Sequence, residues 1–245
     1  MPATPFRVIS FDCFGTLVDA RAGLRAALAG EIPGAGSRIE LLLGALADRM
    51  WEALEELEEF RPHRDLLAGC LVEAGRAAGL ELPADAAARV AASCGSWPLY
   101  PDAPAALATL AGRWPIAVIS NAGAEDLGRI VARLGVAVAK SISSDHVGSF
   151  KPEPDHFLAL LHEMELDEEQ LLHVSASPEF DLQTVEDLGI PRAYVDRDGR
   201  GLPEEITATL RFRDLGGLAR RLVEPARRGP SRGRAARPGR GGGKT

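Results

Sequence analysis

The chain has 245 residues, 46% of them hydrophobic and 26% charged, which is enough for one large domain or for a core with a smaller domain attached. Its apolar runs are too short to span a bilayer, and its first residues lack the pattern of a signal peptide, so we expect a cytoplasmic protein without a membrane partner. The three cysteines, Cys13, Cys70 and Cys94, form no C-x-x-C pair, which argues against common zinc and redox motifs.

Charge is unevenly distributed along the chain. The net charge is -7, yet residues 225–245 contain seven Lys or Arg and no acid, so the remainder is more acidic than this total. An acidic body argues against a nucleic-acid partner for the folded part. Residues 224–245 are rich in Gly, Pro and Arg, and we expect them to form a disordered basic tail.

Short apolar runs rich in β-branched residues recur along the chain and predict strands. All but the last are followed by a loop and a helical pattern, which is typical of a parallel sheet covered by helices. The predicted fold class is therefore α/β, with a Rossmann-like parallel sheet. Because carboxyl ends of parallel strands meet at one edge, we expect Asp12, Ser120, Lys151 and Ser175 to gather there. The runs cover residues 6–12, 115–120, 138–143, 171–177 and 190–196.

A helical domain is predicted between the first two strands. This region has helical spacing of apolar residues and few strand signals. An insertion directly after the first strand lies over the edge where ligands bind, so we expect it to act as a lid. The predicted helices cover residues 24–32, 38–60, 63–80 and 83–95.

The first predicted strand ends in FDCFGTLVD, residues 11–19. An acid directly after a buried strand, followed by Gly and Thr, presents a carboxylate where the chain must turn sharply. A carboxylate can attack carbon or phosphorus and form an ester or acyl phosphate that water later cleaves. We therefore predict Asp12 as a nucleophile, with Lys151 offsetting its charge and that of an anionic substrate.

This segment resembles the first motif of the haloacid dehalogenase superfamily, in which the leading Asp forms a covalent intermediate. The other motifs follow in order: ISN at 119–121 resembles the second, KP at 151–152 the third, and residues 173–191 the fourth. The resemblance covers residues 6–222, with the helical insert as the family's cap domain. It implies a hydrolase with an α/β core at 1–18 and 99–223 and a cap at 19–98.

The resemblance and the residue types together suggest roles for the remaining polar residues. Thr16 is expected to hydrogen-bond to the Asp12 loop or to substrate, and Asp181 to hold Lys151 or a cation. Ser120 and Asn121 can donate hydrogen bonds to a substrate oxygen. Ser175 and Ser177, with Asp181, are expected to position the water that cleaves the ester.

Two departures from the commoner family pattern favour one branch. Phosphatases of this superfamily usually carry a second Asp two residues after the nucleophile, where this chain has Phe14, and Phe cannot donate a proton. They also usually begin the fourth motif with Gly-Asp, where this chain has Ser175-Ala176. The 2-haloacid dehalogenase branch accepts an aromatic residue at the second position and uses no metal, and a halide leaves without protonation.

The sequence therefore favours a hydrolase that releases halide from a small anionic organic substrate and leaves a 2-hydroxy acid, without a cofactor. That branch uses a cap arginine, for which Arg49 is the first candidate and Arg61 the second. One alternative is a phosphatase in which Asp12 and Asp181 bind Mg²⁺. Another is a fold that has lost catalysis and serves as a binding or regulatory module. The sequence does not decide the oligomeric state, so a homodimer remains one of the alternatives.

Overall fold

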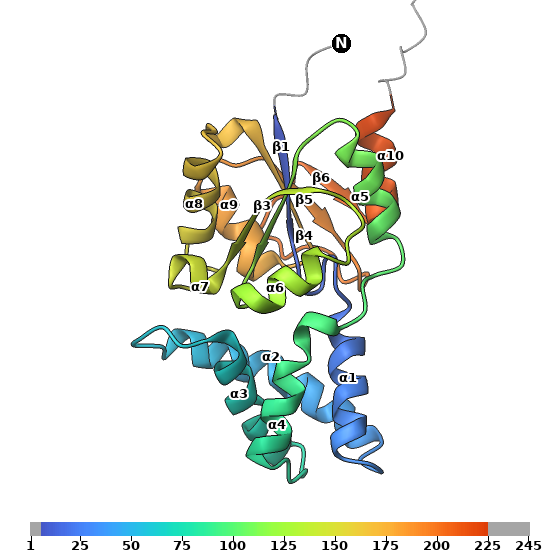
Figure 1. The fold of residues 1–245 in the computed structure, drawn as a ribbon, viewed down its shortest axis with the longest axis vertical. Helices are drawn as coiled ribbons and strands as arrows, with labels where there is room; N and C mark the ends of the chain where they lie inside the picture. The colour runs from blue at the N-terminus through green and yellow to red at the C-terminus, as the bar shows by residue number, and fades with distance from the viewer. Residues whose placement is uncertain (1–5, 225–245) are drawn as a thin grey trace, which may run out of the picture.

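A computed structural model describes residues 6–224 and shows a parallel sheet with a helical layer below it (Figure 1). All neighbouring strands are parallel, and their order is β3-β2-β1-β4-β5-β6. The strands are β1 (Val8–Asp12), β2 (Ile116–Ser120), β3 (Val138–Ser143), β4 (Leu171–Ser175), β5 (Arg192–Val195) and β6 (Leu210–Phe212).

The strand order reverses between β1 and β4, and this places the site. In open α/β sheets, ligands bind outside the carboxyl ends of the strands at such a switch point. Asp12 is the last residue of β1, and β4 ends beside it at Ser175. The fold thus sets the first and fourth predicted motifs side by side.

Helices cover both faces of the sheet because successive residues of each strand point to opposite sides. Ile9 and Phe11 of β1 pack into the cluster that contains α5 (Ala103–Ala111) and α10 (Leu215–Val223). Val8 packs into the cluster that contains α8 (Asp155–Glu163) and α9 (Gln183–Asp187). The polar residues Ser10 and Asp12 therefore lie on the α8 face of the sheet, with Asp12 at its carboxyl edge. The shorter helices α6 (Ala124–Val131) and α7 (Ser144–Val147) follow β2 and β3.

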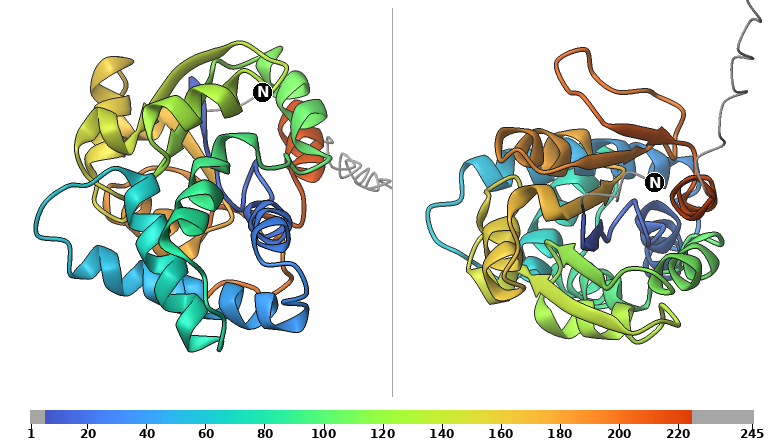
Figure 2. Two further views of the ribbon diagram at one scale, coloured as in Figure 1. Left: turned by 60° about the horizontal axis from the view of Figure 1, so that its bottom comes forward. Right: turned by 90° about the horizontal axis from the view of Figure 1, so that it is seen from above.

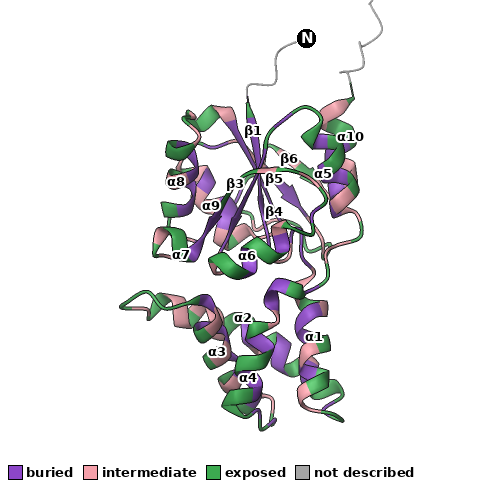
Figure 3. Ribbon diagram, viewed as in Figure 1, coloured by how far each residue is buried: buried purple, intermediate pink, exposed green. Residues whose placement is uncertain are grey.

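Four helices, α1 to α4, follow β1 and form the cap over the carboxyl edge of the sheet (Figures 1 and 2). Each of these helices contributes buried apolar residues to the core, and the buried positions are purple in Figure 3. A bidentate ion pair ties the cap to the sheet domain, because Arg64 donates to both carboxylate oxygens of Asp126 on α6 at 2.6 Å each. The helices are α1 (Ala20–Glu31), α2 (Ser37–Glu55), α3 (His63–Ala77) and α4 (Ala84–Ala92).

The α/β class, the parallel sheet, its first five strands and the helical insert are confirmed. The predicted helix over 38–60 is wrong at its end, since α2 stops at Glu55. Four acids lie in 55–59, and negative charge at a helix carboxyl end opposes the helix dipole. Strand β6 was not predicted. None of the described helices has both the length and the apolar character needed to cross a membrane, and of the predicted basic tail, residues 225–245 lie outside the described part.

Candidate active site

Asp12 sits where β1 turns sharply into the cap. Gly15 adopts a φ of +86°, which a side chain would disfavour, and this turn brings Thr16 back over the strand end. Thr16 Oγ1 donates to Asp12 Oδ2 at 2.7 Å and accepts from the backbone N–H of Ala176 at 2.8 Å. The first and fourth motifs are therefore joined through the Thr16 hydroxyl.

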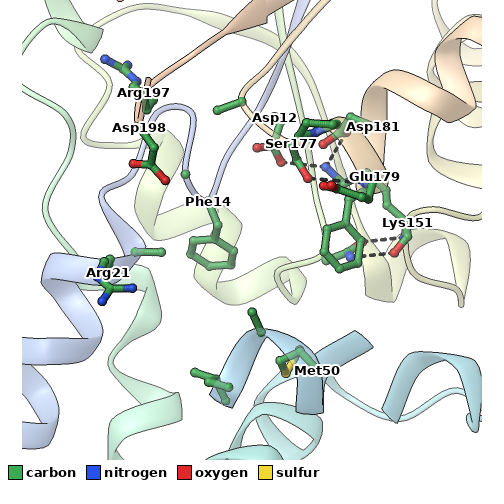
Figure 4. Close-up of a pocket in the computed structure, with 18 of the residues that line it drawn as sticks. Asp12, Phe14, Arg21, Met50, Lys151, Ser177, Glu179, Asp181, Arg197 and Asp198 are labelled. Atoms are coloured by element: carbon green, nitrogen blue, oxygen red, sulfur yellow. Dashed lines mark hydrogen bonds and ion pairs between the residues drawn. The ribbon is translucent and has the colours of Figure 1, made fainter. Parts of the chain in front are cut away.

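Lys151 bridges the two carboxylates of the site (Figure 4). Its Nζ donates to Asp12 Oδ1 and to Asp181 Oδ1, each at 2.7 Å. The lysine is only 2% exposed, Asp12 5% and Asp181 0%, so three charges are enclosed almost without water. Two carboxylates and one ammonium leave a net charge of about -1 in this enclosure.

A column of buried polar side chains continues below this cluster. Ser175 Oγ donates to Asp181 Oδ2 at 2.9 Å, and His173 Nε2 lies 3.1 Å from Asp181 Oδ1. The other ring nitrogen of His173 lies 2.8 Å from Ser10 Oγ. Asp181 belongs to a single π-helical turn, Pro178–Leu182, a distortion found often at functional sites. Both Asp181 oxygens are thereby engaged, which fixes the carboxylate that holds Lys151.

Burial and pairing shift the pKa values of the three charged groups. Burial raises the pKa of Asp12, an effect that the attraction of Lys151 only partly offsets and the charge of Asp181 adds to. Burial also disfavours the charged forms of Asp181 and Lys151, but pairing outweighs it. The pKa of Asp181 is lowered by Lys151 and His173, and that of Lys151 is raised by the two carboxylates. Asp12 is thus the carboxylate of the pair that is less stabilised as an anion.

Asn121 of the second motif holds the backbone of Lys151 in place. Asn121 Oδ1 accepts from the backbone N–H of Lys151 at 2.7 Å, and Asn121 Nδ2 donates to the Lys151 carbonyl at 3.1 Å. Ser120 is buried, and its Oγ accepts from the Ala122 N–H at 3.0 Å. Asn121 lines the cavity described below and Ser120 does not. Hydrogen bonding of this pair to a substrate oxygen stays a prediction.

A cavity of about 830 Å³ lies between the cap and the strand edge. Asp12, Lys151, Asp181, Asn121 and Ser177 line it from the sheet domain, and helices α1 to α3 line it from the cap. Ser175 lies beneath this wall, and its Oγ accepts from the Ser177 N–H at 2.9 Å. The four ordered motifs therefore converge on one cavity, with Asp12 and Lys151 on its surface.

Phe14 lines this cavity and contacts two aromatic side chains. Its ring stacks on His63 at a centroid separation of 5.7 Å and lies 5.4 Å from Trp97. His63 Nδ1 is buried and has no hydrogen-bond partner among the described residues. Burial lowers the pKa of His63 to about 4, so the imidazole is neutral at pH 7. An aromatic, uncharged surface thus stands where an acid two residues after Asp12 would stand.

Arg49 lies apart from this site. Its guanidinium pairs with Glu52 on an exposed face of α2, and the cavity wall formed by residues 6–224 does not include it. Sequence reasoning missed Arg197, which lines the cavity after β5, donates to the Thr16 carbonyl at 2.8 Å and pairs with Asp102 at 2.9 Å. It also missed His63. Arg197 follows the end of a predicted strand, and this position could have indicated a site residue. No local sequence pattern marks His63.

The model of the haloacid dehalogenase-like hydrolase family matches residues 6–189. The chain belongs to this family. The match spans β1, the cap, and the segments that carry Lys151 and Asp181, so it includes every motif that the cavity brings together.

Solved structures of similar fold agree with this family. An L-2-haloacid dehalogenase from Xanthobacter autotrophicus with chloropropionic acid covalently bound has a TM-score of 0.77 at 21% identity, covering 89% of this chain and 98% of that one. The L-2-haloacid dehalogenase RSc1362 has a TM-score of 0.79 at 20% identity, with the same coverage of both chains. The Bacillus subtilis protein YfnB, assigned as a HAD-hydrolase and bound to magnesium, has a TM-score of 0.75 at 17% identity. The match covers 89% of this chain and 99% of that one. A search of curated protein sequences gave no match. These identities show a shared fold.

The donor set of the hydrolase does not fit a magnesium ion. Magnesium prefers oxygen ligands in octahedral geometry. Here the Lys151 ammonium occupies the position between Asp12 and Asp181, and both Asp181 oxygens hold other partners. Within residues 6–224 no cluster of three or more His, Cys, Asp or Glu side chains is arranged to hold a metal.

Proposed function

We propose that the hydrolase cleaves the carbon–halogen bond of a 2-haloacid through an ester on Asp12. One observation carries this proposal. The Asp12 carboxylate faces a cavity with a lysine at 2.7 Å, while the position that would hold a proton donor for an oxygen leaving group is Phe14. A halide departs as a stable anion and needs no such donor, whereas an alkoxide does.

In the first step a carboxylate oxygen of Asp12 attacks the halogen-bearing carbon of the substrate. A C–O bond forms, the carbon–halogen bond breaks, and the halide leaves with the bonding electron pair. Lys151 and Thr16 hold the two oxygens of Asp12, so the carboxylate is oriented before substrate arrives. The elevated pKa of Asp12 reflects a poorly stabilised anion, which favours attack.

In the second step water attacks the carbonyl carbon of the Asp12 ester. The bond between that carbon and the ester oxygen breaks, the 2-hydroxy acid leaves with this oxygen and one proton of the water, and the other proton passes to solvent. Lys151 Nζ and Thr16 Oγ1 already donate to the two Asp12 oxygens and would stabilise the negative charge that develops there. Asp12 returns as the carboxylate.

The test is halide release from 2-chloropropionate, 2-bromopropionate and longer 2-haloacids in the presence of EDTA. We expect turnover by the native chain and none by Asp12→Asn, which keeps the shape of the side chain and removes its charge. A parallel arm supplies small phosphate esters with Mg²⁺. Halide release that EDTA does not affect supports the proposal. Phosphate release alone would favour the magnesium phosphatase, and no turnover on any substrate would favour a binding module.

A further inference from the structure

The cavity is much larger than the proposed chemistry requires. A haloacid of two or three carbons would fill only a small part of about 830 Å³. Cavities of this size hold and bury ligands as large as drug molecules. The part of the cavity that lies beyond Asp12 and Lys151 is therefore available to the rest of the substrate.

The far wall of the cavity is an apolar stripe of α2. The stripe residues are spaced at helical intervals, so they share one face of the helix. Ala47 is exposed and Met50 and Leu54 are half-buried, so these side chains are not fully covered by packing inside the protein. In Figure 4, Met50 lies on the cap side of the space, across from Phe14 and the catalytic cluster. The stripe consists of Leu43, Leu46, Ala47, Met50 and Leu54.

The cap side of the cavity has few polar groups that could stabilise a charged part of a ligand. Of the side chains that α1, α2 and α3 contribute to the wall of the described cavity, Arg21 and His63 are polar and the others are apolar. Arg21 is paired with Glu40 at 2.7 Å, and His63 is neutral with its ring stacked on Phe14. Burying a charged group there would cost free energy, whereas burying hydrocarbon would gain it.

We propose that the α2 stripe binds a hydrocarbon chain, so that the preferred substrate is a 2-haloacid with a medium-length aliphatic or arylalkyl tail. This inference rests on the proposed function for the reacting end of the substrate. The reacting carbon lies at Asp12 and the tail lies along α2. Each methylene removed from water strengthens binding by about threefold to fourfold.

The first experiment compares kcat/KM for 2-chloropropionate, 2-chlorobutyrate, 2-chlorohexanoate and 2-chlorooctanoate. We expect a rise of about threefold per added methylene until the cavity is filled. A series that is flat, or that falls beyond 2-chlorobutyrate, would overturn the inference.

A pair of variants on α2 locates the tail. Ala47→Trp adds bulk inside the cavity without removing a packed side chain, and it should lower the ratio of octanoate to propionate kcat/KM by about tenfold or more. The matched control is Asp48→Trp, on the neighbouring exposed position outside the cavity wall, which should leave this ratio unchanged. Equal losses on both substrates in Ala47→Trp would count against a tail site.

Binding without turnover separates this inference from the proposed function. If no 2-haloacid releases halide, the proposed function fails, and the tail site is then judged with octanoate and propionate as probes. Stabilisation of the native chain against heat by octanoate but not propionate, reduced in Ala47→Trp, would support the α2 site. No difference between the two acids would overturn it.

Discussion

The strand edge and the cap wall face each other across one cavity but present different kinds of side chain. At the edge, Asp12, Lys151 and Asp181 are buried charges whose oxygens and nitrogen have fixed partners. On the wall, α2 presents half-buried apolar side chains such as Met50, without polar partners. On this basis we propose that the edge carries the reaction and that the wall selects the substrate. Changes at the edge should affect all substrates, and changes on the wall should affect some.

The largest effect is expected from Lys151→Met. The substitution leaves Asp12 and Asp181 as buried carboxylates without a cation, so unfolding free energy should fall by about 3–5 kcal/mol. Loss of a donor to the ester oxygen should lower kcat about 100- to 1,000-fold. Urea unfolding and halide release measure the two effects. Lys140→Met, a half-exposed lysine on β3, is the control, and a Lys151→Met enzyme as active as this control would contradict the account.

The next effect concerns the contact that holds the two regions together. Arg64→Ala leaves Asp126, which is 1% exposed, without its bidentate partner. We expect a loss of about 1–3 kcal/mol in unfolding free energy, and a rise in KM larger than any fall in kcat, because the cap is less firmly placed.

Arg89→Ala is the matched control for this change, since Arg89 pairs with Glu31 and Asp85 inside the cap alone. Urea unfolding and steady-state kinetics of both variants give the comparison. Equal effects of the two substitutions would show that the Arg64–Asp126 contact does not connect the cap to catalysis.

The pH profile probes the edge without a mutation. Asp12 must be ionised to attack, and burial raises its pKa above the ordinary value of 3.8. Activity should therefore be present above this raised pKa and be lost as pH falls through it. Lys151, whose pKa is raised, stays charged and adds no alkaline limb near neutrality. The measurement is kcat/KM against pH, and an acid limb at or below 3.8 would be inconsistent with Asp12 as described.

The smallest effect is expected from Arg49→Ala. The arginine pairs with Glu52 where both side chains are more than 40% exposed, and such surface pairs contribute little. Stability and kcat should stay close to native values in thermal unfolding and halide-release assays. A tenfold fall in kcat would mean that α2 rotates during catalysis and brings Arg49 into the cavity.

The residues at the strand edge could be predicted from sequence because the carboxyl ends of parallel strands lie at one edge of the sheet. Asp12 and Ser175 end or follow apolar runs that read clearly as strands, and strand ends in a parallel sheet meet. Lys151 and Asp181 were found through the order of the motifs. Their contacts agree with the predicted arrangement, while their catalytic roles stay proposals.

The wall could not be predicted in the same way. Which helical residues line a cavity depends on how the cap docks on the sheet, and that is set by long-range contacts such as Arg64 with Asp126. His63 shows the difficulty, since its burial against Phe14 joins residues far apart in sequence. Arg49 shows the converse, because helical spacing alone does not say which face of α2 meets the ligand. The short β6 was missed because three residues carry almost no periodicity.

The central claim is that Asp12 becomes an ester during turnover, and a single turnover in water enriched in oxygen-18 tests it most directly. With enzyme in excess over a 2-chloroacid, the account predicts that the peptide containing Asp12 gains one heavy oxygen, while the 2-hydroxy acid carries the ordinary oxygen that Asp12 supplied. Heavy oxygen in the first-turnover product, with an unlabelled Asp12 peptide, would mean that water attacks the substrate directly and would contradict the account.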